Sequence, residues 1–161
     1  MIDRIELPAT SERTEIWLAL YPQIESLVKH ETDLIAAMAN VCAALHQAFA
    51  WHWIGFYRVV GNELVLGPFQ GPIACTRIAR GKGVCGSAWE QNKTLIVADV
   101  DQFPGHIACS AMSRSEVVVP YHDRSGIVRG VLDIDSTELN GFTPDDASFL
   151  ERICELMRQC D

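Results

Sequence analysis

Cysteine is the most reactive residue type in this chain of 161 residues, six of which are cysteine. Cys75, Cys85 and Cys109 lie beside glycine or other small residues, which let a ligand approach the backbone and leave the sulfur accessible. Cys85 follows the glycines that open a predicted helix, where the helix dipole favours a thiolate, and His106 lies one helical turn before Cys109. These segments therefore predict reactive thiols.

Core packing and metal binding are the alternatives for the cysteines. Cys42 and Cys154 lie on apolar helical stripes and are expected in the core, whereas Cys160 lies in a terminus expected to fray. Cys75, Cys85 and Cys109 lack the paired spacing of structural zinc sites, so a Cys3His site completed by His106 would be atypical. We expect neither a metal nor a cofactor.

Acidic side chains on predicted strands form a second candidate group. Asp133 and Asp135 alternate within VLDID and so point to one face of their strand, and Glu116 begins the apolar run before Pro120. Carboxyl groups that share an apolar pocket have raised pKa values, which lets them donate a proton or pair with an ammonium group. The alternative is that these acids lie at a solvated edge of the sheet and have no functional role.

Aromatic side chains follow the same alternating pattern on another predicted strand. Trp51, Trp53 and Tyr57 are expected to present their rings on one face of that strand. Such a surface either packs in the core or forms a pocket wall for a methyl, thioether or cationic group.

The elements that must position these residues are helices and short strands. Helices are predicted over residues 14–30, broken by Pro22, and over 34–49, whose apolar stripe includes Ile35 and Cys42. Further helices are predicted from Gly83 through Trp89 and after Thr143, which has N-cap chemistry. Strands are predicted over residues 51–60, 63–69, 71–78, 94–100, 115–122 and 127–135. Hairpins at both ends predict an α+β fold with an antiparallel sheet covered by helices.

Composition and charge restrict the class of function. The formal net charge of −8 argues against a nucleic-acid partner, and no apolar run is long enough to span a membrane. The charged N-terminal segment is unlike a signal peptide, so we expect a cytoplasmic protein with small-molecule or protein partners. One domain over residues 1–161, with a lead-in over residues 1–13, is expected.

Three motifs together resemble the GAF-domain free methionine-(R)-sulfoxide reductases. They are FQGPIACTRIARGKGVCGSAW at 69–89, DVDQFPGHIACSAMSRSEVVVP at 99–120 and GVLDIDS at 130–136. The resemblance extends from the first helix to the last and departs only around 78–80, where the family often carries a proline. It implies a GAF fold, with a central antiparallel sheet of about six strands flanked by helices, and a homodimer.

The resemblance also implies roles for individual residues. Cys109 matches the family's nucleophile, Cys75 its resolving cysteine and Cys85 a third, auxiliary cysteine. The substrate-binding positions match Trp53, Tyr57, Glu116, Asp133 and Asp135. The implied reaction reduces free L-methionine-(R)-sulfoxide through a sulfenic acid and an intramolecular disulfide, which a thioredoxin-type protein then reduces. The alternative is a GAF sensor module that binds a small ligand or reports oxidation without turnover.

Overall fold

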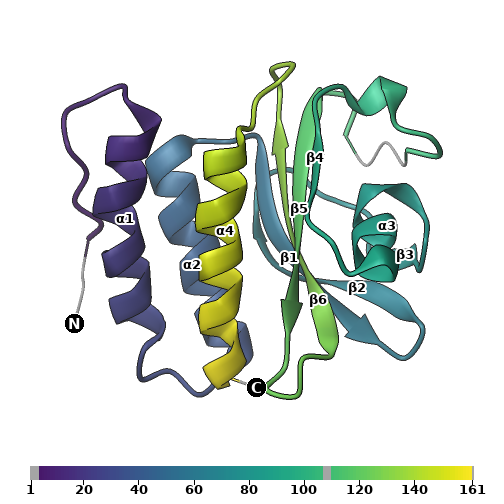
Figure 1. Ribbon diagram of the computed structural model, residues 1–161, viewed down its shortest axis with the longest axis horizontal. Helices are drawn as coiled ribbons and strands as arrows, with labels where there is room; N and C mark the ends of the chain where they lie inside the picture. Colours follow the sequence, from purple (N-terminus) through teal and green to yellow (C-terminus); the bar gives the residue numbers. More distant parts are fainter. Residues whose placement is uncertain (1–3, 107–109, 161) are drawn as a thin grey trace.

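A six-stranded antiparallel sheet organises the computed structural model, which describes residues 4–106 and 110–160 (Figure 1). The strand order is β3-β2-β1-β6-β5-β4, and every neighbouring pair is antiparallel. The strands are β1 (Trp53–Val60), β2 (Glu63–Gln70), β3 (Arg77–Ala79), β4 (Leu95–Val97), β5 (Ser115–His122) and β6 (Val128–Ser136). The predicted α+β class and antiparallel sheet are confirmed.

Helices cover both faces of the sheet, as the resemblance implied (Figure 1). On one face, α2 (Leu34–Phe49) and α4 (Pro144–Leu156) pack against the strands, and α1 (Arg13–Val28) packs on these two helices as an outer layer. On the other face, α3 (Gly83–Gln91) contacts β5 and β6. Two short 3-10 helices follow β4 and α4, at Val100–Gln102 and Met157–Cys160. Within residues 4–106 and 110–160, no helix is long and apolar enough to cross a bilayer.

The predicted break of the first helix at Pro22 is wrong, because α1 runs through this residue. Proline removes one backbone hydrogen bond, that to the carbonyl of Leu18. Pro22 and Leu18 both lie on the exposed face of α1, where water can bind the free carbonyl. The opposite face buries Trp17, Leu20, Ile24 and Val28, and this burial holds both halves of the helix in place.

The predicted apolar stripe of α2 is largely confirmed, and Cys42 is fully buried on it. Ile35 is an exception, since its side chain is exposed. Cys154 is buried in α4 as predicted. Cys160 is also buried, and its thiol donates to the carbonyl of Glu31 at 3.3 Å, so the fraying expected at this position is wrong.

The aromatic residues near the start of β1 divide between the two faces of the sheet. Trp53 and Tyr57 face α3, but Trp51 packs in the core under the other three helices, with its ring 4.3 Å from that of Phe49. The prediction that Trp51 shares their face is wrong because β1 begins only at Trp53, so strand alternation does not extend to residue 51.

The connection between the hairpin and α3 also differs from the prediction. The β1–β2 turn at Gly61 and Asn62 is confirmed, with Gly61 at a φ of 64°. The strand predicted over 71–78 is reduced to β3, and residues 71–76 form a loop. The carbonyls of Pro72 and Cys75 in this loop accept hydrogen bonds from side chains of β1, and the carbonyl of Thr76 accepts one from the backbone of β2. Cys75 therefore lies in a loop against the sheet.

The start of α4 is built as its sequence predicts. Thr143 is the N-cap and Pro144 follows it, while Thr143 and Asp146 form a reciprocal capping box. The buried carboxylate of Asp146 also accepts from Trp17 Nε1 at 2.7 Å and from Arg13 at 2.6 Å. These bonds join α4 to α1 and fix the helical layer behind the sheet.

Candidate active site

A pocket opens on the α3 face of the sheet, and all five predicted substrate-binding residues line it. The space between its walls, counting the open mouth, is about 530 Å³. Strands β1, β5 and β6 form its floor, the start of α3 forms one wall, and the loop before β3 forms another. The site therefore combines residues that are far apart in the sequence.

The three acids meet because β5 and β6 are paired in a register that places them on one face. Glu116 lies directly opposite Asp135, and Asp133 lies opposite Val118, which also faces α3. Glu116 and Asp133 are each only 6% exposed. The prediction of a shared acidic pocket is confirmed, and the solvated-edge alternative is wrong for these two residues.

Burial changes the ionisation of all three acids. It raises the pKa of Glu116 well above its usual value, and the neighbouring Asp133 and Asp135 add to this rise. It likewise raises the pKa of Asp135, with a further contribution from Asp133. The pKa of Asp133 rises to about 6, again because of burial, although hydrogen bonds with Cys85 and Glu116 act in the opposite direction. The cluster therefore holds its protons to a higher pH than ordinary carboxyl groups do.

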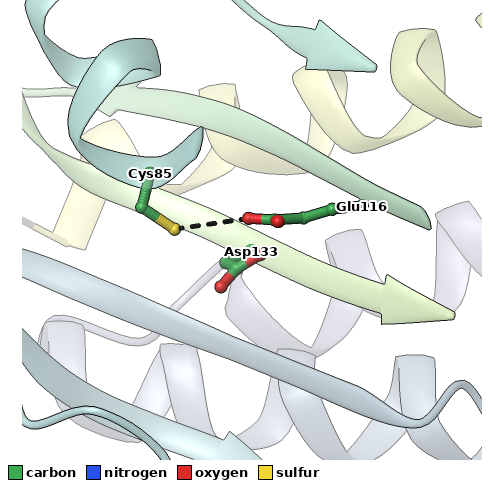
Figure 2. Close-up of side chains that lie close together, drawn as sticks. All are labelled: Cys85, Glu116 and Asp133. Carbon is green, nitrogen blue, oxygen red and sulfur yellow. Dashed lines mark hydrogen bonds between the residues drawn. The ribbon is translucent and has the colours of Figure 1, made fainter. Parts of the chain in front are cut away.

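Cys85 joins this acidic cluster from the first turn of α3. Its free thiol donates to Glu116 Oε1 across 3.8 Å, and the side chain points toward both Glu116 and Asp133 (Figure 2). Burial, followed by the charges of Asp133 and Glu116, raises the pKa of the Cys85 thiol. The expectation that the helix N-terminus would favour a thiolate here is therefore wrong, since burial and two acids outweigh the helix dipole.

Trp53 and Tyr57 form the aromatic wall, which confirms that they line a pocket. Their ring centroids are 5.8 Å apart, and the ring of Phe69 stacks on Trp53 at 5.4 Å. Gly55, between them in β1, makes room for this arrangement, because a Cβ there would lie 2.3 Å from Trp53 Cη2.

The polar atoms of the same two rings hold the loop that carries Cys75. Trp53 Nε1 donates to the carbonyl of Pro72 at 3.1 Å, and the Tyr57 hydroxyl donates to the carbonyl of Cys75 at 2.9 Å. Cys75 is half-buried and packs against the apolar cluster on the α3 face. The aromatic wall thus connects the pocket to the Cys75 loop.

Cys109, the predicted nucleophile, lies outside the described residues. The last residue described before it, His106, and the first described after it, Ser110, both line the pocket. His106 Nε2 is 3.9 Å from Glu116 Oε2. The zinc site suggested as an alternative also includes Cys109, so it too lies partly outside the described residues.

Some pocket residues were not predicted from the sequence. Ser113 forms a side-chain hydrogen bond with Asp135, Lys82 lines the pocket beside the start of α3, and Ser110 bonds to His52 at 3.0 Å. These residues lie in irregular segments, where no periodic pattern indicates which way a side chain points. Only their proximity to Cys85 and Cys109 in the sequence could have suggested them.

Comparison with known proteins agrees with this architecture. The GAF domain family matches residues 31–160. GAF domain-containing protein A of Dictyostelium discoideum is 52% identical over 158 residues, covering 98% of this chain and 99% of that protein. Free methionine-R-sulfoxide reductase of Escherichia coli strain K12 is 44% identical over 142 residues, which cover 88% of this chain and 86% of the relative.

A solved structure gives the same result at the level of the fold. The free methionine-R-sulfoxide reductase of Neisseria meningitidis, in complex with its substrate, superposes with a TM-score of 0.93 and 46% identity, covering 98% of this chain and 94% of that one. The GAF fold implied by the sequence motifs is therefore confirmed. With this fold, this pocket and these relatives, the chain belongs to the GAF-domain family of free methionine-(R)-sulfoxide reductases.

Proposed function

We propose that this protein reduces free L-methionine-(R)-sulfoxide to L-methionine in the pocket on the α3 face. One observation carries the proposal: three acids with raised pKa values, an aromatic wall and the residues on both sides of Cys109 line the same cavity. The reductase of Escherichia coli and the substrate complex from Neisseria meningitidis support the same activity.

Substrate recognition uses the two chemically different sides of the pocket. The S-methyl group and thioether of the substrate pack on Trp53 and Tyr57, since sulfur contacts aromatic rings favourably. One carboxylate of the acidic cluster pairs with the substrate ammonium group. This pairing favours the free amino acid, because a methionine residue within a peptide has no such ammonium.

Reduction transfers the sulfoxide oxygen to a cysteine. The Cys109 thiolate attacks the sulfoxide sulfur while a carboxyl group among Glu116, Asp133 and Asp135 protonates the oxygen. The sulfur–oxygen bond of the substrate breaks, methionine leaves, and Cys109 retains the oxygen as a sulfenic acid. The Cys75 thiol then condenses with it, releasing water and forming a disulfide. Cys85 is auxiliary in this cycle.

Regeneration of the two thiols requires an electron donor. We propose a dithiol protein of the thioredoxin type, which reduces the disulfide by thiol exchange and becomes oxidised itself. On the strength of the family resemblance, we also propose that the protein is a cytoplasmic homodimer. Each subunit forms a single domain over residues 1–161, with a lead-in over residues 1–13.

The test is a coupled assay that follows thioredoxin-dependent consumption of reductant. We expect turnover with the free R epimer, none with the S epimer or a peptide-bound sulfoxide, and none in Cys109→Ser. Cys154→Ser is the matched control, because this cysteine is buried in α4, behind the opposite face of the sheet, and should retain turnover. If substrate adds nothing to the background rate, the sensor alternative is favoured over the enzyme.

A further inference from the structure

Three side chains at the base of the pocket have the donor atoms of a soft-cation site. The Cys85 sulfur and one carboxylate oxygen from each of Glu116 and Asp133 all lie within 4.8 Å of one another. They come from α3, β5 and β6, and Figure 2 shows them converging on a common space. A tetrahedral zinc ion has bonds of about 2.3 Å to sulfur and about 2.0–2.2 Å to oxygen, so small side-chain rotations bring these donors into range.

A second observation also points to a missing ligand. Asp133 Oδ1 is buried, lines the pocket and has no hydrogen-bond partner in the described part of the chain. A buried carboxylate oxygen without a donor carries an unpaid desolvation cost, which a bound cation would remove. Across residues 4–106 and 110–160, no lysine or arginine forms an ion pair with Glu116 or Asp133.

A fourth donor lies at the rim. His106 Nε2 is 3.9 Å from Glu116 Oε2, and its side chain is mostly buried. One thiolate, one imidazole and two carboxylates make a four-ligand set. The sulfur disfavours magnesium and calcium, which prefer oxygen ligands, and selects zinc.

We propose that Zn²⁺ binds to Cys85, Glu116 and Asp133, with His106 as the fourth ligand, and thereby inhibits the enzyme. Binding forms only coordination bonds and releases the ligands' protons to solvent, so no electrons are transferred. Inhibition rests on the proposed function, because the zinc ion occupies the carboxylates that the substrate needs. Zinc binding itself does not depend on turnover.

Competition with the substrate is the kinetic consequence. Since zinc and sulfoxide use the same carboxylates, added Zn²⁺ should raise KM and leave kcat unchanged, and saturating substrate should restore the rate. Mg²⁺ at the same concentration should have no effect. Zinc that lowers kcat without changing KM would place the inhibitory ion outside the pocket and overturn the proposal.

The direct test measures metal binding to the reduced protein in the absence of substrate. Co²⁺ is the probe, because a cobalt ion with a cysteine ligand gives a thiolate-to-cobalt charge-transfer band, and Zn²⁺ should displace it. We expect the wild-type protein to bind one Co²⁺ per chain. In Cys85→Ser the charge-transfer band should disappear, and the affinity for Co²⁺ should fall by at least about 10-fold. Cys75→Ser is the matched control and should retain band and affinity.

A second variant keeps the test decisive if Cys85→Ser fails to fold. Glu116→Gln should weaken Co²⁺ binding by at least about 10-fold while the charge-transfer band persists at higher cobalt concentration. Absence of the band from the wild-type protein, or its loss in Cys75→Ser and survival in Cys85→Ser, would refute the site. Either result leaves the separate assay of sulfoxide reduction unaffected, so the two proposals fail independently.

Discussion

Removal of the Tyr57 hydroxyl should slow disulfide formation without slowing formation of the sulfenic acid. The Tyr57 hydroxyl donates to the Cys75 carbonyl at 2.9 Å, and Trp53 Nε1 provides a second bond to the same loop at Pro72. Burial raises the pKa of Tyr57, so its hydroxyl remains a donor at working pH. Tyr57→Phe keeps the aromatic wall and removes only one of the two anchors.

The expected size of the effect follows from one hydrogen bond. Such a bond contributes about 1 kcal/mol, which corresponds to roughly a fivefold change in the population of the anchored loop. Formation of the sulfenic acid should be unchanged, because the ring that faces the substrate is still present. Disulfide formation by Cys75 should slow by about fivefold, because its loop samples other positions.

Rapid-quench kinetics can measure both steps in one experiment. A sulfenic-acid trap reports the first step in a single turnover, and thiol titration with mass spectrometry reports the disulfide. Tyr21→Phe, on α1 beyond the opposite face of the sheet, is the matched control and should change neither rate. Equal slowing of both steps in Tyr57→Phe, or no slowing of the second, would refute the role of this bond in positioning Cys75.

Three further predictions test other parts of the structure. Glu116→Gln should lower kcat/KM for the free R epimer by about 10²–10⁴-fold, because the amide cannot transfer a proton. Circular dichroism should show that the fold is intact. An unchanged rate would assign the acid role to the two aspartates. Gly55→Ala should lower the free energy of unfolding, measured in urea, by about 1–3 kcal/mol, because its Cβ would lie 2.3 Å from Trp53. An unchanged free energy of unfolding would show that the Trp53 ring can move freely. Burial raises the pKa of the Cys42 thiol to about 12, so iodoacetamide at neutral pH should leave Cys42 unlabelled in the folded protein and label it after denaturation. Labelling of the native protein at this position would contradict its burial in α2.

Local signals in the sequence predicted the elements that local chemistry determines. The capping residues of α4 and the Gly61-Asn62 turn act within a few residues, and both appear as expected. Pro22 was misread because its effect depends on which face of α1 meets solvent, and that is decided by tertiary packing. The strand predicted around Cys75 is wrong because the carbonyls of Pro72 and Cys75 bond to side chains of β1, which a local pattern cannot predict.

The candidate site likewise combines residues that local patterns predict with residues that only the folded chain brings together. Strand alternation alone placed Asp133 and Asp135 on one face, and the pairing of β5 with β6 added Glu116. The pKa of Cys85 could not be predicted from its helix, because the burial and the acids that raise it come from the folded molecule. Ser113 and Lys82 reach the pocket from irregular segments, so helix or strand periodicity does not predict them.

Incubation with an equal mixture of the two sulfoxide epimers tests the proposed activity in a single experiment. The protein is incubated with equal amounts of the R and S epimers of free methionine sulfoxide and a dithiol reductant, and methionine is quantified by chiral chromatography until the reaction stops. We expect methionine to accumulate to half of the starting sulfoxide and only the S epimer to remain. No methionine above the protein-free control, or consumption of both epimers at similar rates, would contradict it.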